Sequence, residues 1–130
     1  MSFHIRFNTE LRIVHAVFFD RVDFAEKLAS ARQIAEKFGH LHPLRVLVDV
    51  RRADIVLSVK ERQKFGKFVA RQTGTSHSRV AVLHAPDFNA NIIINSAAQS
   101  EGMQVREFVT EQAAQGWLMM EAEGAGREPA

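Results

Sequence analysis

A short apolar run followed by a helix start constrains this chain more than any other stretch. Residues 44–50 (LRVLVDV) are rich in β-branched side chains, which is typical of a strand covered on both faces. Their alternation places Val46, Val48 and Val50 on one face and Leu47 on the other. Because both faces are apolar, we predict an interior strand.

A helix is predicted directly after that strand. Ser58 and Glu61 match the capping box, in which the two side chains satisfy the first free amides of a helix. We therefore predict a helix from Val59 to about Gln72, and we interpret residues 51–54 (RRAD) as a turn between the strand and the helix.

The residues before this unit predict a hairpin and a first helix. Residues 3–7 and 11–19 alternate as strands and are separated by a turn, while Asp23 and Glu26 predict a helix that ends at Gly39. Its polar side chains are expected to face solvent; they are Glu26, Lys27, Arg32, Glu36 and Lys37.

The residues after it continue the alternation. We predict a strand over 80–83, a helix over 88–100 capped by Asp87, a strand over 103–109 and a last helix capped by Thr110. Trp117 and Phe108 are expected in the core rather than at a cofactor. The order predicts an α/β fold with a mixed sheet of about five strands, an initial hairpin, parallel β-α units and flanking helices.

Length and composition indicate one domain over residues 1–120, with a flexible tail at 121–130. The absence of cysteine excludes disulfides and thiol chemistry and suits a cytoplasmic protein. No apolar run reaches the ~20 residues of a transmembrane helix. A net charge of +2 gives no reason to expect nucleic-acid binding.

Common catalytic motifs are missing from the sequence. It contains no P-loop, dinucleotide-binding, nucleophile-elbow or zinc-protease pattern, so we expect no enzyme and no cofactor. His40 and His42 have a chelating spacing, but no third ligand has a definite register, and we expect no metal.

The order of elements, the segment Leu47-Val48-Asp49-Val50 and Ser58 nine residues after Asp49 resemble the STAS domain of anti-sigma-factor antagonists. The ending VREFVT (105–110) is similar to the stand-alone bacterial branch of that superfamily. The resemblance implies that Ser58 accepts phosphate from a kinase-type anti-sigma factor. Here Leu57 and Val59 flank the serine, where the family has an acidic residue and a small one; the alternative is that Ser58 only caps its helix.

Charge is unevenly distributed along the chain. Residues 44–79 hold nine basic and three acidic side chains, so this segment is more basic than the rest. Four of the basic residues share one helix face at spacings of three and four residues: Lys60, Lys64, Lys67 and Arg71. They form either a solvated face or a surface that attracts an acidic partner. Asp49 is equally a site residue or a turn cap.

We therefore expect a non-catalytic regulatory module that binds a protein partner with an acidic surface. The expected contacts are Asp49, Asp54, Lys60, Lys64, Lys67 and Arg71, with Asp49 and Ser58 at the two ends of one loop. The alternative is a domain that binds a small apolar molecule or lipid between sheet and helices. A cavity of a few hundred Å³ would favour that alternative, whereas a filled core beside a basic helix would favour the protein partner.

Overall fold

The computed structural model describes residues 2–120. The tail predicted at 121–130 lies outside these residues. The elements in chain order are β1 (Phe3–Asn8), β2 (Ile13–Val22), α1 (Phe24–Phe38), β3 (Arg45–Ile55), α2 (Val59–Arg71), β4 (Arg79–Leu83), α3 (Ile92–Ser100), β5 (Gln104–Phe108) and α4 (Glu111–Leu118).

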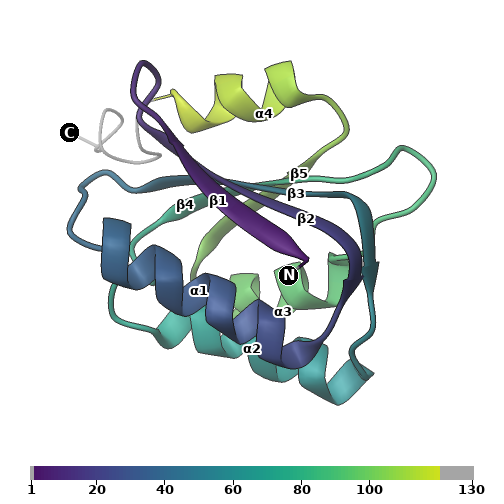
Figure 1. Ribbon diagram of the computed structural model, residues 1–130. Helices are drawn as coiled ribbons and strands as arrows, with labels where there is room; N and C mark the ends of the chain where they lie inside the picture. The colour runs from purple at the N-terminus through teal and green to yellow at the C-terminus, as the bar shows by residue number, and fades with distance from the viewer. Residues whose placement is uncertain (1, 121–130) are drawn as a thin grey trace, which may run out of the picture.

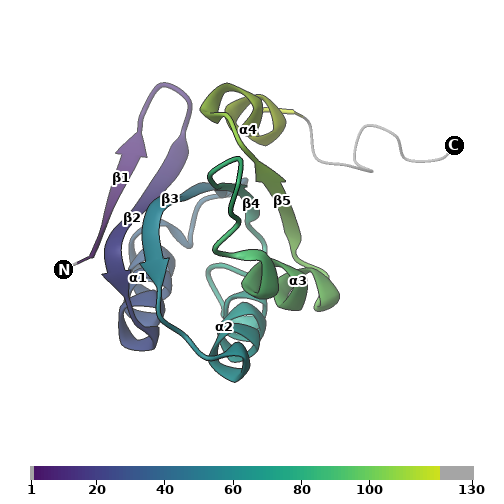
Figure 2. The ribbon, with the colours of Figure 1, turned by 90° about the vertical axis from the view of Figure 1, so that its right-hand side faces the viewer.

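The five strands form one sheet in the order β1-β2-β3-β4-β5. β1 and β2 are antiparallel, and every other neighbouring pair is parallel. Each crossover steps to the next strand in the same direction, so crossovers of the same hand place their helices on one face. Figures 1 and 2 show α1, α2 and α3 on one side of the sheet and α4 on the other. The predicted α/β fold with an initial hairpin is confirmed.

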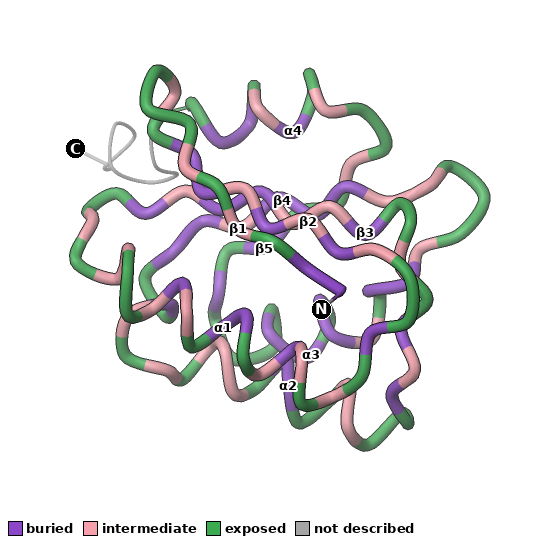
Figure 3. Tube along the Cα trace, in the orientation of Figure 1, coloured by how far each residue is buried: buried purple, intermediate pink, exposed green. Residues whose placement is uncertain are grey.

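β3 lies at the centre of the sheet and is apolar on both faces, as predicted. Val46 and Val50 belong to the core beneath α1, α2 and α3, whereas Leu47 packs with Trp117 and Leu118 of α4. Figure 3 shows buried residues along the strands and on helix turns that face the sheet, with the outward turns of the helices exposed.

The predicted turn at residues 51–54 is wrong, because β3 continues to Ile55. β4 pairs with β3 only as far as Asp49, but the longer β2 pairs with the rest of β3, with a register shift between Val17 and Phe19. Arg51, Arg52 and Asp54 are exposed side chains of a strand that extends beyond its other neighbour. The polar composition of this segment reflects exposure and not a turn.

The helix predicted over 88–100 starts four residues later, at Ile92. Ala85 and Phe88 form an isolated bridge, and Asp87 does not cap the helix. Asn91 occupies the N-cap position but makes no side-chain cap bond. Its side-chain amide instead forms hydrogen bonds with the buried side chains of Lys27 and Asn95.

The first helix is capped by Asp23 and Glu26 as predicted, and it ends at Phe38. The expectation that Lys27 faces solvent is wrong, because its side chain is only 1% exposed. Lys27 lies on the same helix face as Ala31 and Ile34, at spacings of four and seven residues. This face packs toward the sheet, so the lysine points into the interior.

Candidate functional site

Ser58 lies at the exposed start of α2. Its Oγ accepts a hydrogen bond from the Glu61 amide at 3.1 Å, and its own amide donates to the Glu61 carboxylate at 2.9 Å. The predicted capping box is therefore confirmed. The hydroxyl is exposed where the free amides and the helix dipole favour an anion.

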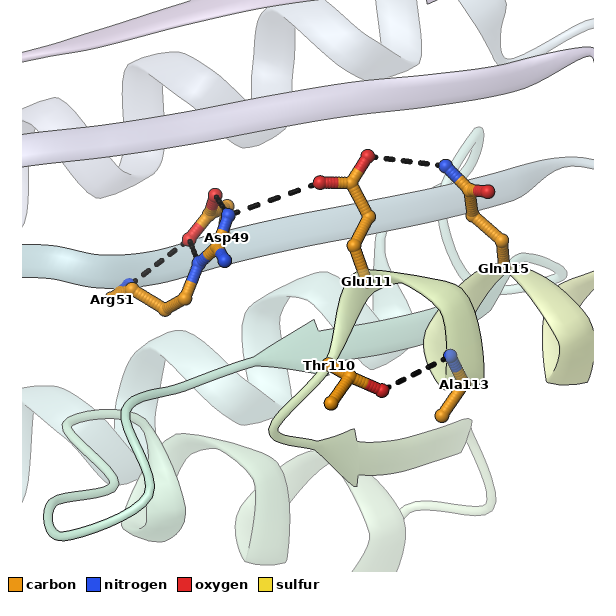
Figure 4. Close-up of polar contacts among 6 residues, drawn as sticks. All are labelled: Asp49, Arg51, Thr110, Glu111, Ala113 and Gln115. Carbon is orange, nitrogen blue, oxygen red and sulfur yellow. Dashed lines mark hydrogen bonds and ion pairs between the residues drawn. The ribbon is translucent and has the colours of Figure 1, made fainter.

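Asp49 does not share a loop with Ser58, so that prediction is wrong. Asp49 lies inside β3, and its carboxylate faces α4 (Figure 4). It accepts hydrogen bonds from Arg51, whose guanidinium also lies 3.8 Å from Glu111 of α4. Burial alone would raise the pKa of Asp49, but the bonds from Arg51 outweigh it and lower that pKa. The pair links β3 to α4 on the sheet face opposite α2.

The basic face predicted on α2 is exposed, and it borders a groove. Lys60, Lys64, Lys67 and Arg71 are all exposed, whereas Phe65 on the other side of the helix is buried. A groove of about 600 Å³ runs between α1 and α2. Its lining is apolar in part, with Phe24, Leu28 and Phe68, and otherwise polar or basic, with Arg32, Lys64, Lys67, Arg71 and Gln72.

Two contacts within this groove modify the predicted charge pattern. Arg71 pairs with Glu101, with 2.8 Å between Nε and Oε1, so its charge is partly neutralised. The ammonium of Lys64 lies 5.9 Å from the centre of the Phe24 ring. The contribution of α1 was missed by sequence reasoning because only packing of α1 against α2 brings Arg32 beside the lysines. Its helical spacing from Phe24 and Leu28 was the available signal.

Lys27 is a second feature that sequence reasoning missed. Its ammonium donates to Asn91 Oδ1 at 3.1 Å and lies 4.1 Å and 5.5 Å from the centres of the Phe18 and Phe65 rings. Burial, together with the positive charge of Arg62, lowers the pKa of Lys27 to about 7. The lysine therefore releases its proton much more readily than an exposed lysine does.

A chain of side-chain amides connects Lys27 to the surface. Asn91 donates to Asn95 Oδ1 at 2.8 Å, and Asn95 donates to the carboxylate of Glu107 at 2.7 Å. These bonds fix the orientation of the Asn91 amide, so that its oxygen faces the lysine. Within residues 2–120, the side-chain amide of Asn91, at the start of α3, thus provides the hydrogen-bond acceptor for the buried amine.

The described residues, 2–120, contain no group of three metal-ligating side chains that could hold an ion. His42, from the predicted loop pair, stacks on His77 with 4.2 Å between ring centres. Within the same residues, no helix is long and apolar enough to span a membrane.

No family model matches the chain, and no curated protein matches it. Among solved structures, the chain is similar to an uncharacterized protein of the DUF3478 family from Shewanella loihica PV-4, described as having a SpoIIAA-like fold. The similarity covers 90% of this chain and 92% of that chain, at 14% sequence identity and a TM-score of 0.59. At a sequence identity this low, the similarity shows the fold and not the function. The chain therefore has a SpoIIAA-like fold.

Proposed function

We propose that this protein is a non-catalytic STAS-like regulatory module whose groove between α1 and α2 binds an acidic segment of a protein partner. The observation that supports the proposal is the groove itself. It combines an apolar floor of Phe24, Leu28 and Phe68 with basic side chains from both helices.

This combination suits an acidic amphipathic helix. Apolar side chains of such a helix would cover the phenylalanine and leucine side chains of the floor, as in other helix-in-groove complexes. Its carboxylates would meet Arg32, Lys64 and Lys67 at the rim, where charge mainly speeds association and selects the partner. Lys60 and Asp54 are exposed near the start of α2 and would contact a partner that extends past the groove.

Two features of the structure refine the expected contacts. Asp49 faces α4, so it lies outside the surface that we propose, although it was among the expected contacts. Arg71 is paired with Glu101 and would contribute less than the two lysines.

The alternative ligand, a small apolar molecule or lipid bound between the sheet and the helices, has less support. The cavity between the sheet and the helices measures about 70 Å³, whereas sites for such ligands usually measure a few hundred Å³. The core is nearly filled, and a basic helix lies beside it. A filled core beside a basic helix favours a protein partner over an apolar ligand.

Ser58 offers a means of regulation within the same proposal. A kinase-type anti-sigma factor would phosphorylate the exposed hydroxyl, which adds a charge of about −2 at the start of α2. That charge would reduce the positive potential of the helix that carries Lys60, Lys64 and Lys67. Phosphorylation is therefore expected to weaken the binding of an acidic segment.

Charge reversal in the groove tests the proposal. With a partner recovered by pull-down from the native cell extract, the double variant Lys64→Glu/Lys67→Glu should associate at least tenfold more slowly at low salt, because electrostatic steering changes on-rates by about 10-fold or more. The effect should shrink at high salt. Binding kinetics at two salt concentrations measure both.

The matched control carries the same change of charge away from the groove. Arg6 of β1 and Lys37 of α1 are exposed and do not line the groove. The variant Arg6→Glu/Lys37→Glu should keep most of the association rate. Equal slowing by the two double variants would mean that net charge, and not the groove, governs binding.

A further inference from the structure

The interior cavity has a mostly apolar lining that includes several polar side chains, of which Lys27 is the one that can carry a charge. It lies between the sheet and helices α1, α2 and α3, and its apolar lining includes Ala16, Val46, Val82, Ile94 and Met103. The side chain of Lys27 lines the same cavity. An amine is therefore presented to a small, mostly apolar space.

The amine of Lys27 has unused hydrogen-bonding capacity. An ammonium group has three donors, and one bonds Asn91 while the Phe18 and Phe65 rings lie nearby. No ion pair among residues 2–120 includes Lys27. A buried ammonium without an anionic partner is costly, which makes an exogenous anion the natural complement.

The neighbouring cation, Arg62, also lacks an anionic partner among the described residues. Its guanidinium donates to the main-chain carbonyls of Leu57, Ala90 and Ile55 at 2.8–3.1 Å. Its charge acts on Lys27. The nearest carboxylate on the hydrogen-bond chain from Lys27 is that of Glu107, beyond the amides of Asn91 and Asn95. The potential at the amine is thus favourable to a negative charge.

The hydroxyl groups of the lining are already engaged as donors. Ser30 donates to Lys27 O, Thr75 to Val69 O and Ser78 to Thr75 O, at 2.6–2.8 Å. The Asn91 amide donates to Asn95. Among these lining side chains, the donors not used in these bonds are those of the Lys27 ammonium and the second N–H of the Asn91 and Asn95 amides, and only the ammonium carries a charge.

We propose that this cavity binds a short-chain monocarboxylate, with its carboxylate on Lys27 and its alkyl group among the apolar side chains. The volume limits the size, since a cavity of about 150 Å³ holds benzene, with six non-hydrogen atoms, and one of 70 Å³ therefore holds about three. Acetate, with about four, comes nearest to this size among carboxylates that carry an alkyl group. The site is independent of the groove between α1 and α2.

Binding should be linked to protonation of Lys27. The pKa of the free amine is about 7, and a carboxylate beside it would raise that pKa. The ligand then binds the protonated form, so affinity should fall as pH rises above 7. The other charged groups near the amine, Arg62 and Glu107, already hydrogen bond to main-chain carbonyls and to Asn95 respectively.

Calorimetric titration with sodium acetate tests the proposal, with sodium chloride as the blank. The native protein should show saturable binding with net uptake of protons near pH 7, measured in two buffers of different ionisation enthalpy. Lys27→Met should weaken binding at least tenfold, while Lys37→Met, a change of exposed charge on the same helix, should leave it unchanged. Hexanoate, which exceeds the cavity, should bind at least tenfold more weakly than acetate.

A second variant separates loss of the amine from repacking of the cavity. Asn91→Asp keeps Lys27 but places a carboxylate beside it, which should compete with acetate and weaken its binding at least tenfold. Circular dichroism and thermal unfolding establish that each variant is folded. Absence of saturable binding to the native protein, equal binding by the folded Lys27→Met variant, or tighter binding of hexanoate would overturn the proposal.

Discussion

Replacing Lys27 by methionine should stabilise the protein at neutral pH. The displacement of the lysine pKa from 10.5 to about 7 corresponds to roughly 5 kcal/mol of unfavourable free energy when the folded protein must hold the charge. Methionine has a similar length and no charge, but it leaves Asn91 Oδ1 without its donor, at a cost of about 1–3 kcal/mol. The net gain in the free energy of unfolding at pH 7 should be about 2–4 kcal/mol.

The stability advantage of the methionine variant should disappear as pH rises, because releasing the proton of Lys27 on folding costs less free energy at higher pH. Between pH 7 and pH 10.5 the unfolded chain binds a proton at this lysine that the folded chain has released. The native protein therefore becomes more stable with rising pH in this window relative to the methionine variant. The difference in free energy of unfolding should change by about 2 kcal/mol between about pH 7.5 and pH 9.

Urea unfolding of both proteins at these pH values measures the effect. Lys37→Met is the matched control, because Lys37 is exposed on the same helix. A methionine variant less stable than the native protein at every pH would show that Lys27 supports the fold as a charged group.

Replacing Gly66 by alanine should strongly destabilise the protein. Gly66 lies where α2 crosses α3, and an added Cβ would lie 2.7 Å from the Cβ of Ala97 and 3.1 Å from the amide nitrogen of Ala98. The same atom would also clash with the carbonyl oxygen of Ile94. Because backbone atoms of α3 must move, we expect a loss of about 3 kcal/mol or more in the free energy of unfolding.

The same substitution at Gly116 is the control. Gly116 lies within α4, and no atom of the described residues would come within 4 Å of its added Cβ. Alanine is the better helix former, so Gly116→Ala should stabilise by about 0.5–1 kcal/mol. Similar changes in the free energy of unfolding for Gly66→Ala and Gly116→Ala would mean that α2 and α3 are not in close contact at Gly66.

The parts of the fold that were predicted correctly depend on local sequence signals. The caps at Asp23 and Ser58 are contained within four residues, and the alternation of β3 is visible because both of its faces are apolar. The strand order follows from these elements and from short right-handed connections. The resemblance to the STAS domain implies the same order of strands and helices.

The errors arose where neighbours distant in sequence decide the outcome. Residues 51–54 look like a turn, but the length of β2 keeps them in the sheet. Lys27 looks solvated by residue type, but its position relative to Ala31 and Ile34 turns it inward. Asn91 and not Asp87 precedes α3, and its side chain accepts a hydrogen bond from Lys27, which is distant in sequence, and does not cap the helix.

The candidate groove was only half visible in the sequence. The spacing of Lys60, Lys64, Lys67 and Arg71 revealed the contribution of α2. The contribution of α1 depends on how the two helices pack, and pairing of Arg71 with Glu101 depends on where α3 ends. Helical periodicity predicts which residues share one face of one helix, whereas a groove is formed by two helices packed together.

Site-specific photo-crosslinking in the native cells tests the proposed groove most directly. A photoreactive residue is introduced in place of Lys67, on the rim of the groove, or in place of Gln112, which is exposed on α4 across the sheet. We predict that the Lys67 position captures a protein through a segment rich in aspartate and glutamate, and that adding Lys64→Glu reduces the yield. Capture of the same partner from Gln112 with little from Lys67 would place the interface on α4 and contradict the groove.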